Sequence, residues 1–212
     1  MIDRALREKA AQVLEVFRAR GLKIATAESC TGGLVAGALT EIAGSSDVLD
    51  CGFVTYSNAA KQAMLGVPEA TLKRHGAVSA QTAAAMAAGA LKNSQADVAV
   101  AITGIAGPGG GAAEKPVGLV HFAAASRDGS RLARTRRYGK IGRRRVRERS
   151  VSEALRLLEL LTKASRPWKC ASQSSNSIAT GRSAISSSRS ASIRGHRSRS
   201  RSTSGSTISA RP

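Results

Sequence analysis

A serine stands where a strand is expected to give way to a helix. Ser29 lies in the run 28–33 (Glu-Ser-Cys-Thr-Gly-Gly), after an apolar stretch at 22–27 and before a helix-like segment at 34–42. Backbone N–H groups at the start of a helix lack internal partners and carry partial positive charge, so they favour an anion. A serine beside such amides has a nucleophilic oxygen and a candidate oxyanion hole. The alternative interpretation is a helix cap.

Lys61 is the better candidate for the base that this serine needs. His75 is expected at a helix end, where a cation favours the dipole, while His121 lies in mid-strand and His196 near the C-terminus. Lys61 is expected in the first turns of the helix after the second strand, where the dipole lowers the pKa of a lysine and favours the neutral amine. A neutral lysine can accept the serine proton, as in Ser-Lys hydrolases. A solvated surface lysine is the alternative.

Two neighbours of this pair are also candidates. Tyr56 ends the second strand at the same edge, where its hydroxyl can relay a proton or bind substrate; the alternative is a half-buried tyrosine with an outward hydroxyl. Cys30 is a rival nucleophile, but successive residues at a helix start point in different directions, so only one of Ser29 and Cys30 can face the site. A buried free cysteine is the alternative for Cys30.

A glycine-rich loop and two arginines suggest a place for a ligand. The loop 104–111 follows the apolar strand 97–103, and ligands of open α/β sheets bind at the carboxyl ends of strands. The loop lacks the Gly-Lys-Ser/Thr of a P-loop and the GxGxxG dinucleotide fingerprint, so a flexible surface loop is the alternative. Arg143 and Arg147 share one helix face and suit a phosphate, or form a solvated basic face.

The elements that position these residues alternate between helices and strands. Their spacing predicts an α/β layered fold with a mixed sheet, because one hairpin signal at 127–129 interrupts the alternation. Helices are predicted at 3–20, 33–43, 58–65, 68–76, 79–92 and 143–161, and strands at 22–27, 52–56, 97–103, 117–125 and 132–138.

The net charge of +19 is concentrated toward the C-terminus of the 212-residue chain. Residues 1–126 carry +1, residues 127–162 carry +8 and residues 163–212 carry +10, so basicity is not a property of the main fold. The last segment has 17 serines and no acidic residue, and we predict a folded domain at 1–162 and a disordered Ser/Arg-rich tail at 163–212. This tail is interpreted as an RNA- or phosphate-binding arm, a solvated tail without a dedicated role, or a reading-frame artefact.

Several classes of protein are excluded by composition. No run of about 18 apolar residues is present, so no membrane span is expected, and the N-terminus lacks a secretory apolar region. The three cysteines have no metal-ligand spacing. We therefore expect a cytoplasmic protein in a reduced setting, with neither a metal nor another cofactor.

The motifs, taken together and in order, resemble the CinA C-terminal domain family, which includes the nicotinamide-nucleotide amidases. The resemblance covers about residues 5–161. The matching stretches are TAESCTGG at 26–33, IAGSS at 42–46, GFVTYSN at 52–58 with Lys61, GAVS at 76–79, TGIAGP at 103–108 and KPVG at 115–118.

This resemblance implies a three-layer α/β/α sandwich that hydrolyses the carboxamide of nicotinamide mononucleotide to nicotinate mononucleotide and ammonia, as part of NAD recycling. It implies a homodimer, a nucleotide substrate and no cofactor. Ser29 would be the nucleophile and Lys61 the base, with Tyr56 beside them. The residues implied in substrate binding are the turn amides of Thr31, Gly32 and Gly33, and Thr103, Gly104 and Gly107 in the glycine-rich loop.

The start of the last helix departs from the family pattern. The family often has Gly-Asp-Arg-x-x-Val-Arg, whereas this chain has Ile-Gly-Arg-Arg-Arg-Val-Arg at 141–147, so the aspartate is missing while both arginines align. Arg143 remains the predicted ligand of the substrate phosphate. The Ser/Arg tail also has no expected counterpart in the family.

Two alternatives to an amidohydrolase stay open. A non-catalytic nucleotide-binding module would keep the pocket without turnover. An RNA-binding protein would work through residues 127–212, although we expect nucleic acid to bind only non-specifically through the basic tail.

Overall fold

The computed structural model describes residues 2–164, which form a single layered unit. The predicted tail lies outside the described residues, apart from Lys163 and Ala164, which continue the last helix. Within the described range, no helix is both long and apolar enough to cross a membrane. The helices are α1 (Arg4–Ala19), α2 (Leu34–Thr40), α3 (Asn58–Leu65), α4 (Glu69–His75), α5 (Ala80–Lys92), α6 (Arg143–Ala164) and the 3₁₀ helix η1 (Ser45–Asp47); the strands are β1 (Ile24–Glu28), β2 (Leu49–Val54), β3 (Val98–Gly104), β4 (Leu119–Ser126) and β5 (Arg131–Arg137).

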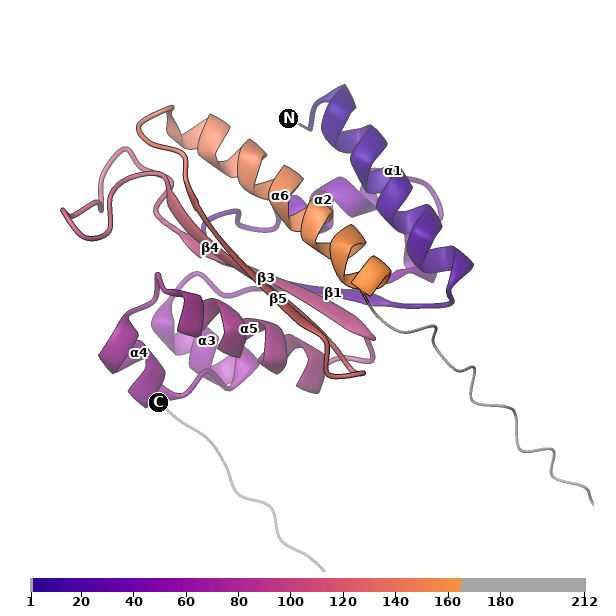
Figure 1. The fold of residues 1–212 in the computed structure, drawn as a ribbon, viewed down its shortest axis with the longest axis horizontal. Coiled ribbons are helices and arrows are strands. Elements are labelled where there is room, and N and C mark those ends of the chain that lie inside the picture. Colours follow the sequence, from indigo (N-terminus) through magenta and orange to yellow (C-terminus); the bar gives the residue numbers. More distant parts are fainter. Residues whose placement is uncertain (1, 165–212) are drawn as a thin grey trace, which may run out of the picture. The chain divides into compact units, whose positions relative to one another are not determined.

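The five strands form one mixed sheet in the order β2-β1-β3-β4-β5. Strand β1 runs parallel to both β2 and β3, whereas β3, β4 and β5 are successively antiparallel. Helices α1, α2 and α6 cover one face of the sheet, and α3, α4 and α5 cover the other (Figure 1). The predicted α/β sandwich with a mixed sheet is therefore confirmed.

The two faces of the sheet are packed with side chains of different size. Toward α6 the strands present large residues such as Ile24, Val100, Ile102 and Phe122. Toward α5 they present alanines, namely Ala25, Ala27, Ala99, Ala101, Ala123 and Ala125. Alternate residues of a strand face opposite sides, so this difference follows directly from the sequence. It lets the alanine-rich helix α5 approach the sheet closely.

Strand β2 and helix α2 differ from the predicted boundaries. Strand β2 begins at Leu49 rather than at residue 52, because a parallel ladder with β1 starts there and includes a register shift beside Ile24. Asp50 and Gly52 are weak strand formers, so sequence alone gave no signal for this start. Helix α2 ends at Thr40, whose hydroxyl donates to the carbonyls of Ala36 and Gly37.

A buried carboxylate holds the start of α2 against the end of β1. Glu28 is the last residue of β1 and is fully buried. Its oxygens accept hydrogen bonds from the backbone amides of Gly33 (3.0 Å), Val35 (3.1 Å) and Ala36 (2.9 Å). Gly33, the residue before the helix, has a left-handed backbone and no capping side chain of its own. The Glu28 carboxylate therefore accepts hydrogen bonds from backbone amides that have no acceptor within the helix.

We expect Glu28→Gln to lower the free energy of unfolding by about 2 kcal/mol. The amide nitrogen of glutamine is a donor, so it would face backbone donors and leave at least one buried N–H without an acceptor. Urea unfolding measures the difference. Glu8→Gln is the matched control, because the Glu8 carboxylate is exposed on α1 beside Arg4 and its loss should cost no more than about 0.5 kcal/mol. Equal stability of the two variants would show that the buried charge is dispensable.

We expect Gly89→Ala to destabilise the fold by about 3 kcal/mol or more, because a β-carbon at Gly89 would overlap the backbone carbonyl of Leu65. Gly37→Ala in α2 is the control: the nearest atom to its β-carbon would be the Ile2 Cδ1 at 4.0 Å, so the better helix propensity of alanine should leave the protein at least as stable. Both are measured by urea unfolding, and a Gly89→Ala protein as stable as wild type contradicts the close packing of α3 on α5.

Candidate active site

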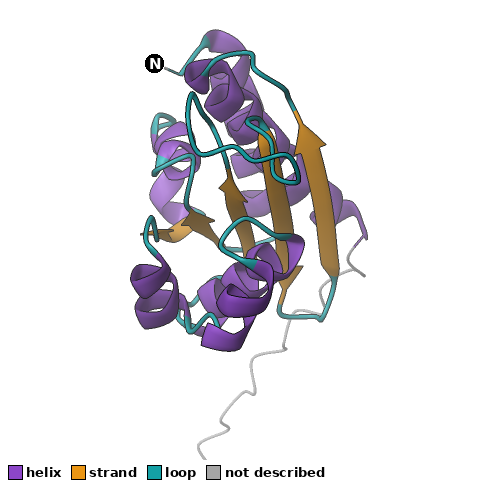
Figure 2. Cartoon of the chain, turned by 90° about the vertical axis from the view of Figure 1, so that its left-hand side faces the viewer, coloured by secondary structure: helices purple, strands orange, loops and turns teal. Residues whose placement is uncertain are grey.

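A solvent-open pocket of about 250 Å³ lies at the carboxyl ends of the parallel strands β1, β2 and β3. The loops that follow these strands gather on the side that faces the viewer in Figure 2. The pocket is lined by Ser29, Cys30, Tyr56, Lys61, Ala77, Val78, Thr103, Gly104, Ile105, Ala106, Gly107, Gly109, Gly110 and Arg143. Most of the residues predicted from sequence thus meet in one place.

Ser29 and Lys61 are in direct contact in this pocket. The Lys61 Nζ lies 3.1 Å from the Ser29 Oγ and donates a second hydrogen bond, of 2.7 Å, to the carbonyl of Thr55. Ser29 follows β1 directly, and its backbone amide donates to the Ile102 carbonyl of β3. Lys61 is the fourth residue of α3, whose start is capped by the hydroxyl of Ser57. Both side chains are therefore positioned by well-defined elements of the fold.

The environment of Lys61 favours a neutral amine. Its side chain is 1% exposed, and Glu28 and Lys61 are the only acidic or basic side chains that are buried among residues 2–164. Burial lowers the pKa of Lys61 from its ordinary value of 10.5, because the charged ammonium loses its water. The direction agrees with the sequence prediction, which had assigned it to the helix dipole. A neutral lysine in contact with a serine hydroxyl is a possible general base.

A ring of contacts joins Ser29, Lys61, Thr55 and Glu28. Lys61 donates to the carbonyl of Thr55, and the amide of Thr55 donates to the backbone carbonyl of Glu28 at 2.8 Å. Glu28 precedes Ser29 in the chain and, through its side chain, holds the start of α2. This role of Glu28 was not predicted from the sequence, because the prediction for the run 28–33 rested on the serine and the glycines.

Tyr56 and Arg143 form the rim of the pocket. The exposed Tyr56 hydroxyl accepts a hydrogen bond of 3.0 Å from Arg143, and Arg143 also donates to the carbonyl of Gly107 at 3.0 Å. Arg143 is the first residue of α6. In the described part of the chain, no hydrogen bond joins the Tyr56 hydroxyl to Ser29 or Lys61. This geometry favours a role of Tyr56 in substrate binding over a role in proton relay.

The glycines of the turn after Ser29 lie outside the pocket lining. The amide of Gly33 donates to the Glu28 carboxylate, and the amide of Gly32 donates to the carbonyl of Ser29 at 3.1 Å. Both amides therefore already have acceptors within the protein. Thr31 is buried and also absent from the lining. Its carbonyl accepts a hydrogen bond of 2.8 Å from Arg147, so Arg147 braces this turn instead of joining Arg143 at the rim.

Cys30 lines the pocket as a protonated thiol. Burial raises the pKa of the Cys30 thiol to about 12, so the nucleophilic thiolate is suppressed. Of the two neighbouring candidates, Ser29 is the one whose side chain is hydrogen-bonded to Lys61. The sequence prediction that only one of them can face the site was wrong, because both Ser29 and Cys30 line the pocket.

The glycine-rich loop forms one wall of the pocket, and the connection between α4 and α5 forms the other. Thr103 is buried and donates to the carbonyl of Ala77 at 2.7 Å, which ties the two walls together. Gly107 has a φ of +79°, and a β-carbon there would collide with Val117, so the loop requires glycine. Ala77 and Val78 were not predicted as site residues, because small apolar side chains carry no chemical signal in a sequence.

A second hollow, of about 410 Å³, lies between α1 and α6 and holds another lysine–serine contact. The Lys9 Nζ donates to the Ser152 Oγ at 2.9 Å, but both residues are partly exposed on helix surfaces. Ser152 lies inside α6, where backbone amides are committed to the helix. Lys9 and Ser152 are neither buried nor beside free backbone amides, so the pocket that contains Ser29 and Lys61 is the candidate site.

No group of three or more histidine, cysteine, aspartate or glutamate side chains is arranged to hold a metal ion between residues 2 and 164. The cysteines described there, Cys30 and Cys51, are both free.

Comparisons with known proteins agree with the motifs and the fold. The family model "CinA C-terminal domain" matches residues 6–162. The "Nicotinamide-nucleotide amidohydrolase PncC" of Escherichia coli (strain K12) is 50% identical over 158 residues, which are 74% of this chain and 95% of that protein. A "CinA-like protein" of Synechococcus sp. (strain RCC307) is 54% identical over 153 residues, which are 71% of this chain.

The match to the Synechococcus protein spans only 36% of that protein's length. Among solved structures, the competence/damage inducible protein CihA from Agrobacterium tumefaciens superposes with a TM-score of 0.75 at 57% identity, covering 76% of this chain and 98% of that one. Together with the family match over most of the chain, these likenesses show that the protein belongs to the CinA C-terminal domain family.

Proposed function

We propose that this protein is an amidohydrolase that converts nicotinamide mononucleotide to nicotinate mononucleotide and ammonia by a Ser-Lys mechanism. The observation that carries the proposal is the contact between the Ser29 hydroxyl and the buried amine of Lys61. The choice of substrate is supported by the 50% identity to a nicotinamide-nucleotide amidohydrolase, 95% of whose length is covered by the match.

In the acylation half of the reaction, the neutral Lys61 takes the proton of the Ser29 hydroxyl. The serine oxygen attacks the carboxamide carbon of the substrate and forms a tetrahedral intermediate. Lys61, now an ammonium, returns the proton to the departing nitrogen as the C–N bond breaks. Ammonia leaves, and the nicotinoyl group remains as an ester on Ser29.

Water completes the cycle by the same proton transfers. Lys61 takes a proton from a water molecule, whose oxygen attacks the ester carbon. The C–O bond to Ser29 breaks, and the proton on Lys61 passes to the Ser29 oxygen. The product leaves as a carboxylic acid that loses its proton to solvent and becomes the carboxylate, and both residues return to their starting state. The Thr55 carbonyl keeps Nζ beside Oγ throughout by accepting one of its N–H bonds.

We assign binding of the remaining substrate groups to the turn and to the rim. The backbone amide of Cys30, which directly follows Ser29 and lines the pocket, is the candidate oxyanion donor, because the amides of Gly32 and Gly33 are occupied and Thr31 lies outside the lining. Arg143, which contacts Tyr56 and Gly107, is the candidate ligand of the phosphate. Its exposed place at the start of α6 suits a charged group that remains partly hydrated.

We expect Ser29→Ala and Lys61→Met each to reduce ammonia release from nicotinamide mononucleotide by at least about a thousandfold, because each removes one half of the reacting pair. Ser152→Ala and Lys9→Met are the matched controls: they break the other lysine–serine contact, outside the pocket, and should keep wild-type turnover. Calorimetric titration with the nucleotide tests whether the inactive variants still bind it.

The same set of proteins separates the alternatives. Turnover retained in Ser29→Ala but lost in Cys30→Ala would transfer the nucleophile to Cys30 and refute the Ser-Lys mechanism. A wild-type protein that binds the nucleotide without releasing ammonia would instead be a binding module.

We expect kcat/KM to rise with pH and to level off above the lowered pKa of Lys61, because only the neutral amine accepts a proton.

The free energy of unfolding should also depend on the protonation of Lys61. Between the lowered pKa and 10.5, the unfolded chain binds the proton more readily than the folded one, so the free energy of unfolding of wild type should rise with pH relative to that of Lys61→Met. Rate profiles and urea unfolding across this range measure both effects; a wild-type profile without an acid limb would contradict a neutral-lysine base.

A further inference from the structure

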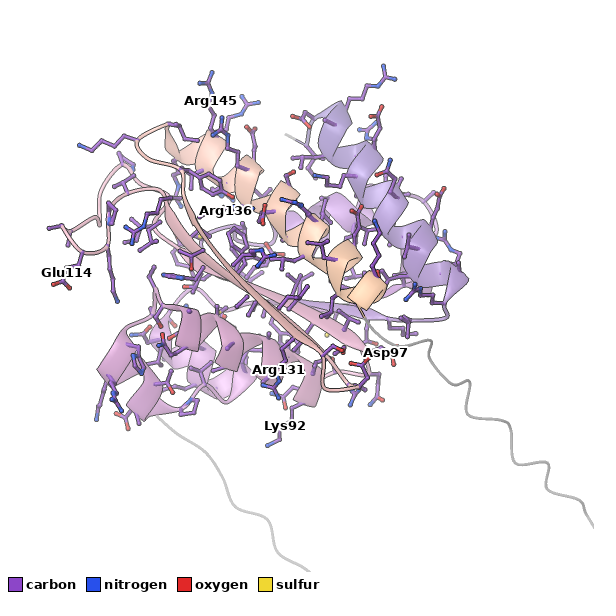
Figure 3. The ribbon with its side chains drawn as sticks, viewed as in Figure 1. Lys92, Asp97, Glu114, Arg131, Arg136 and Arg145 are labelled. Atoms are coloured by element: carbon purple, nitrogen blue, oxygen red, sulfur yellow. The ribbon has the colours of Figure 1, made fainter. Side chains whose placement is uncertain are left out.

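The glycine-rich loop leaves and rejoins the sheet through a narrow base. The amide of Ile105 donates to the Leu119 carbonyl at 2.9 Å, and the amide of Gly118 donates to the Ile105 carbonyl at 2.8 Å. Beyond this base, residues 106–117 form an excursion, and Glu114 at its outer end points away from the body of the protein (Figure 3). The outgoing half of the loop lines the pocket, so its position depends on whatever holds this excursion in place.

Lys115, on the returning half of the loop, makes a contact that the mechanism above does not use. Its Nζ donates a hydrogen bond of 2.7 Å to the carbonyl of His75, the last residue of α4. The final carbonyls of a helix lack internal partners and carry partial negative charge, so a lysine ammonium is favoured there. Gly76 leaves room for it: a β-carbon on Gly76 would lie 2.9 Å from the Lys115 Nζ.

The chain just after this contact is the opposite wall of the pocket. The carbonyl of Gly76 accepts hydrogen bonds from Ser79 and Thr82, and the carbonyl of Ala77 accepts one from Thr103. Ala77 and Val78, which line the pocket, thus lie in a segment where the carbonyls of His75, Gly76 and Ala77 accept hydrogen bonds from side chains. Lys115 fixes the first of these carbonyls and links it to the far half of the glycine-rich loop.

Arg143 holds the same loop from the other side of the sheet. It extends from α6 to the carbonyl of Gly107, while Lys115 extends to α4. Helices α6 and α4 cover opposite faces of the sheet (Figure 1), so the two cations fasten the loop to both helical layers. The returning half also supports the outgoing half directly, because Gly107 packs against the side chain of Val117.

We propose that Lys115 is a positioning residue for substrate binding, which closes the glycine-rich loop onto α4 and sets the width of the pocket between Gly104–Gly110 and Ala77–Val78. Lys115 does not line the pocket, so it acts through the loop and not on the substrate. The proposal rests on the proposed amidohydrolase function for its kinetic readout, but its structural content is independent of that function.

A positioning role of Lys115 predicts that its loss changes KM and leaves kcat nearly unchanged. The contact of Ser29 with Lys61 is built on β1 and α3 and does not involve Lys115, so the chemical step should survive its loss. Substrate binding would then include the cost of ordering the loop. We expect Lys115→Met to raise KM for nicotinamide mononucleotide by about fivefold, the equivalent of one hydrogen bond, with kcat within about twofold of wild type.

The experiment compares Lys115→Met with Lys115→Arg and with Lys73→Met. Arginine keeps a charged donor within reach of the His75 carbonyl and should restore most of the wild-type KM. Lys73 also carries its charge in the last turn of α4, but it pairs with Glu69 on the surface and should be kinetically silent. Hydrogen exchange of the amides of residues 105–118 provides the second readout: exchange should quicken in Lys115→Met and stay at the wild-type rate in the other two variants.

These measurements test the role of Lys115 even if the protein is not an amidase. Unchanged KM and unchanged loop exchange in Lys115→Met would overturn the proposal, as would a loss confined to kcat. A wild-type protein without ammonia release would refute the proposed function, but the exchange rates of the loop would still decide whether Lys115 fastens it. Faster exchange together with a raised KM, both restored by arginine, would establish the positioning role.

Discussion

The buried carboxylate of Glu28 is the interaction on which the candidate site depends. Its oxygens hold three amides at the start of α2, and its backbone carbonyl accepts the amide of Thr55, whose own carbonyl holds Lys61. Ser29 follows Glu28 in the chain, so one residue fixes the direction of Ser29 through its peptide bond and that of Lys61 through Thr55. A buried charge is tolerated only when its hydrogen bonds are complete, and here the backbone supplies them.

The layered packing places this ring at the edge of the sheet. The alanines on one face let α5 lie close to the strands, and Gly89 in turn lets the end of α3 approach α5. Lys61 on α3 is thereby brought within reach of the end of β1. On the other face, the larger side chains space α6 from the sheet, and its first residue, Arg143, reaches over the edge to Gly107. Side-chain volume deep in the core thus sets the distances between groups in the pocket.

Local signals in the sequence were enough to predict the order of the elements and the contact of Ser29 with Lys61. Glycines, caps and alternating apolar residues mark the helices and strands, and the ends of parallel strands meet at one edge. Three features had no local signal. The role of Glu28 depends on amides up to eight residues away, and the pairing of β2 from Leu49 depends on a partner strand. Ala77 and Val78 lie at the pocket in a segment that is hydrogen-bonded to the distant residues Thr103 and Lys115. Such long-range contacts are set by the assembled fold, so propensity and spacing do not reveal them.

The pocket separates a buried floor, where Lys61 lies, from an exposed rim with Arg143, and this separation bears on how a nucleotide amide would react. Lys61 can act as a base only while neutral, and burial rather than its place in α3 is what lowers its pKa. A phosphate bound beside Lys61 would favour the ammonium and raise that pKa again. Arg143 lies at the exposed rim, bonded to Tyr56, where it can pair with an anionic group at a distance from the floor. Under the proposed function, the substrate would therefore place its carboxamide at the floor and its phosphate at the rim, where the phosphate favours the ammonium form of Lys61 less than it would at the floor.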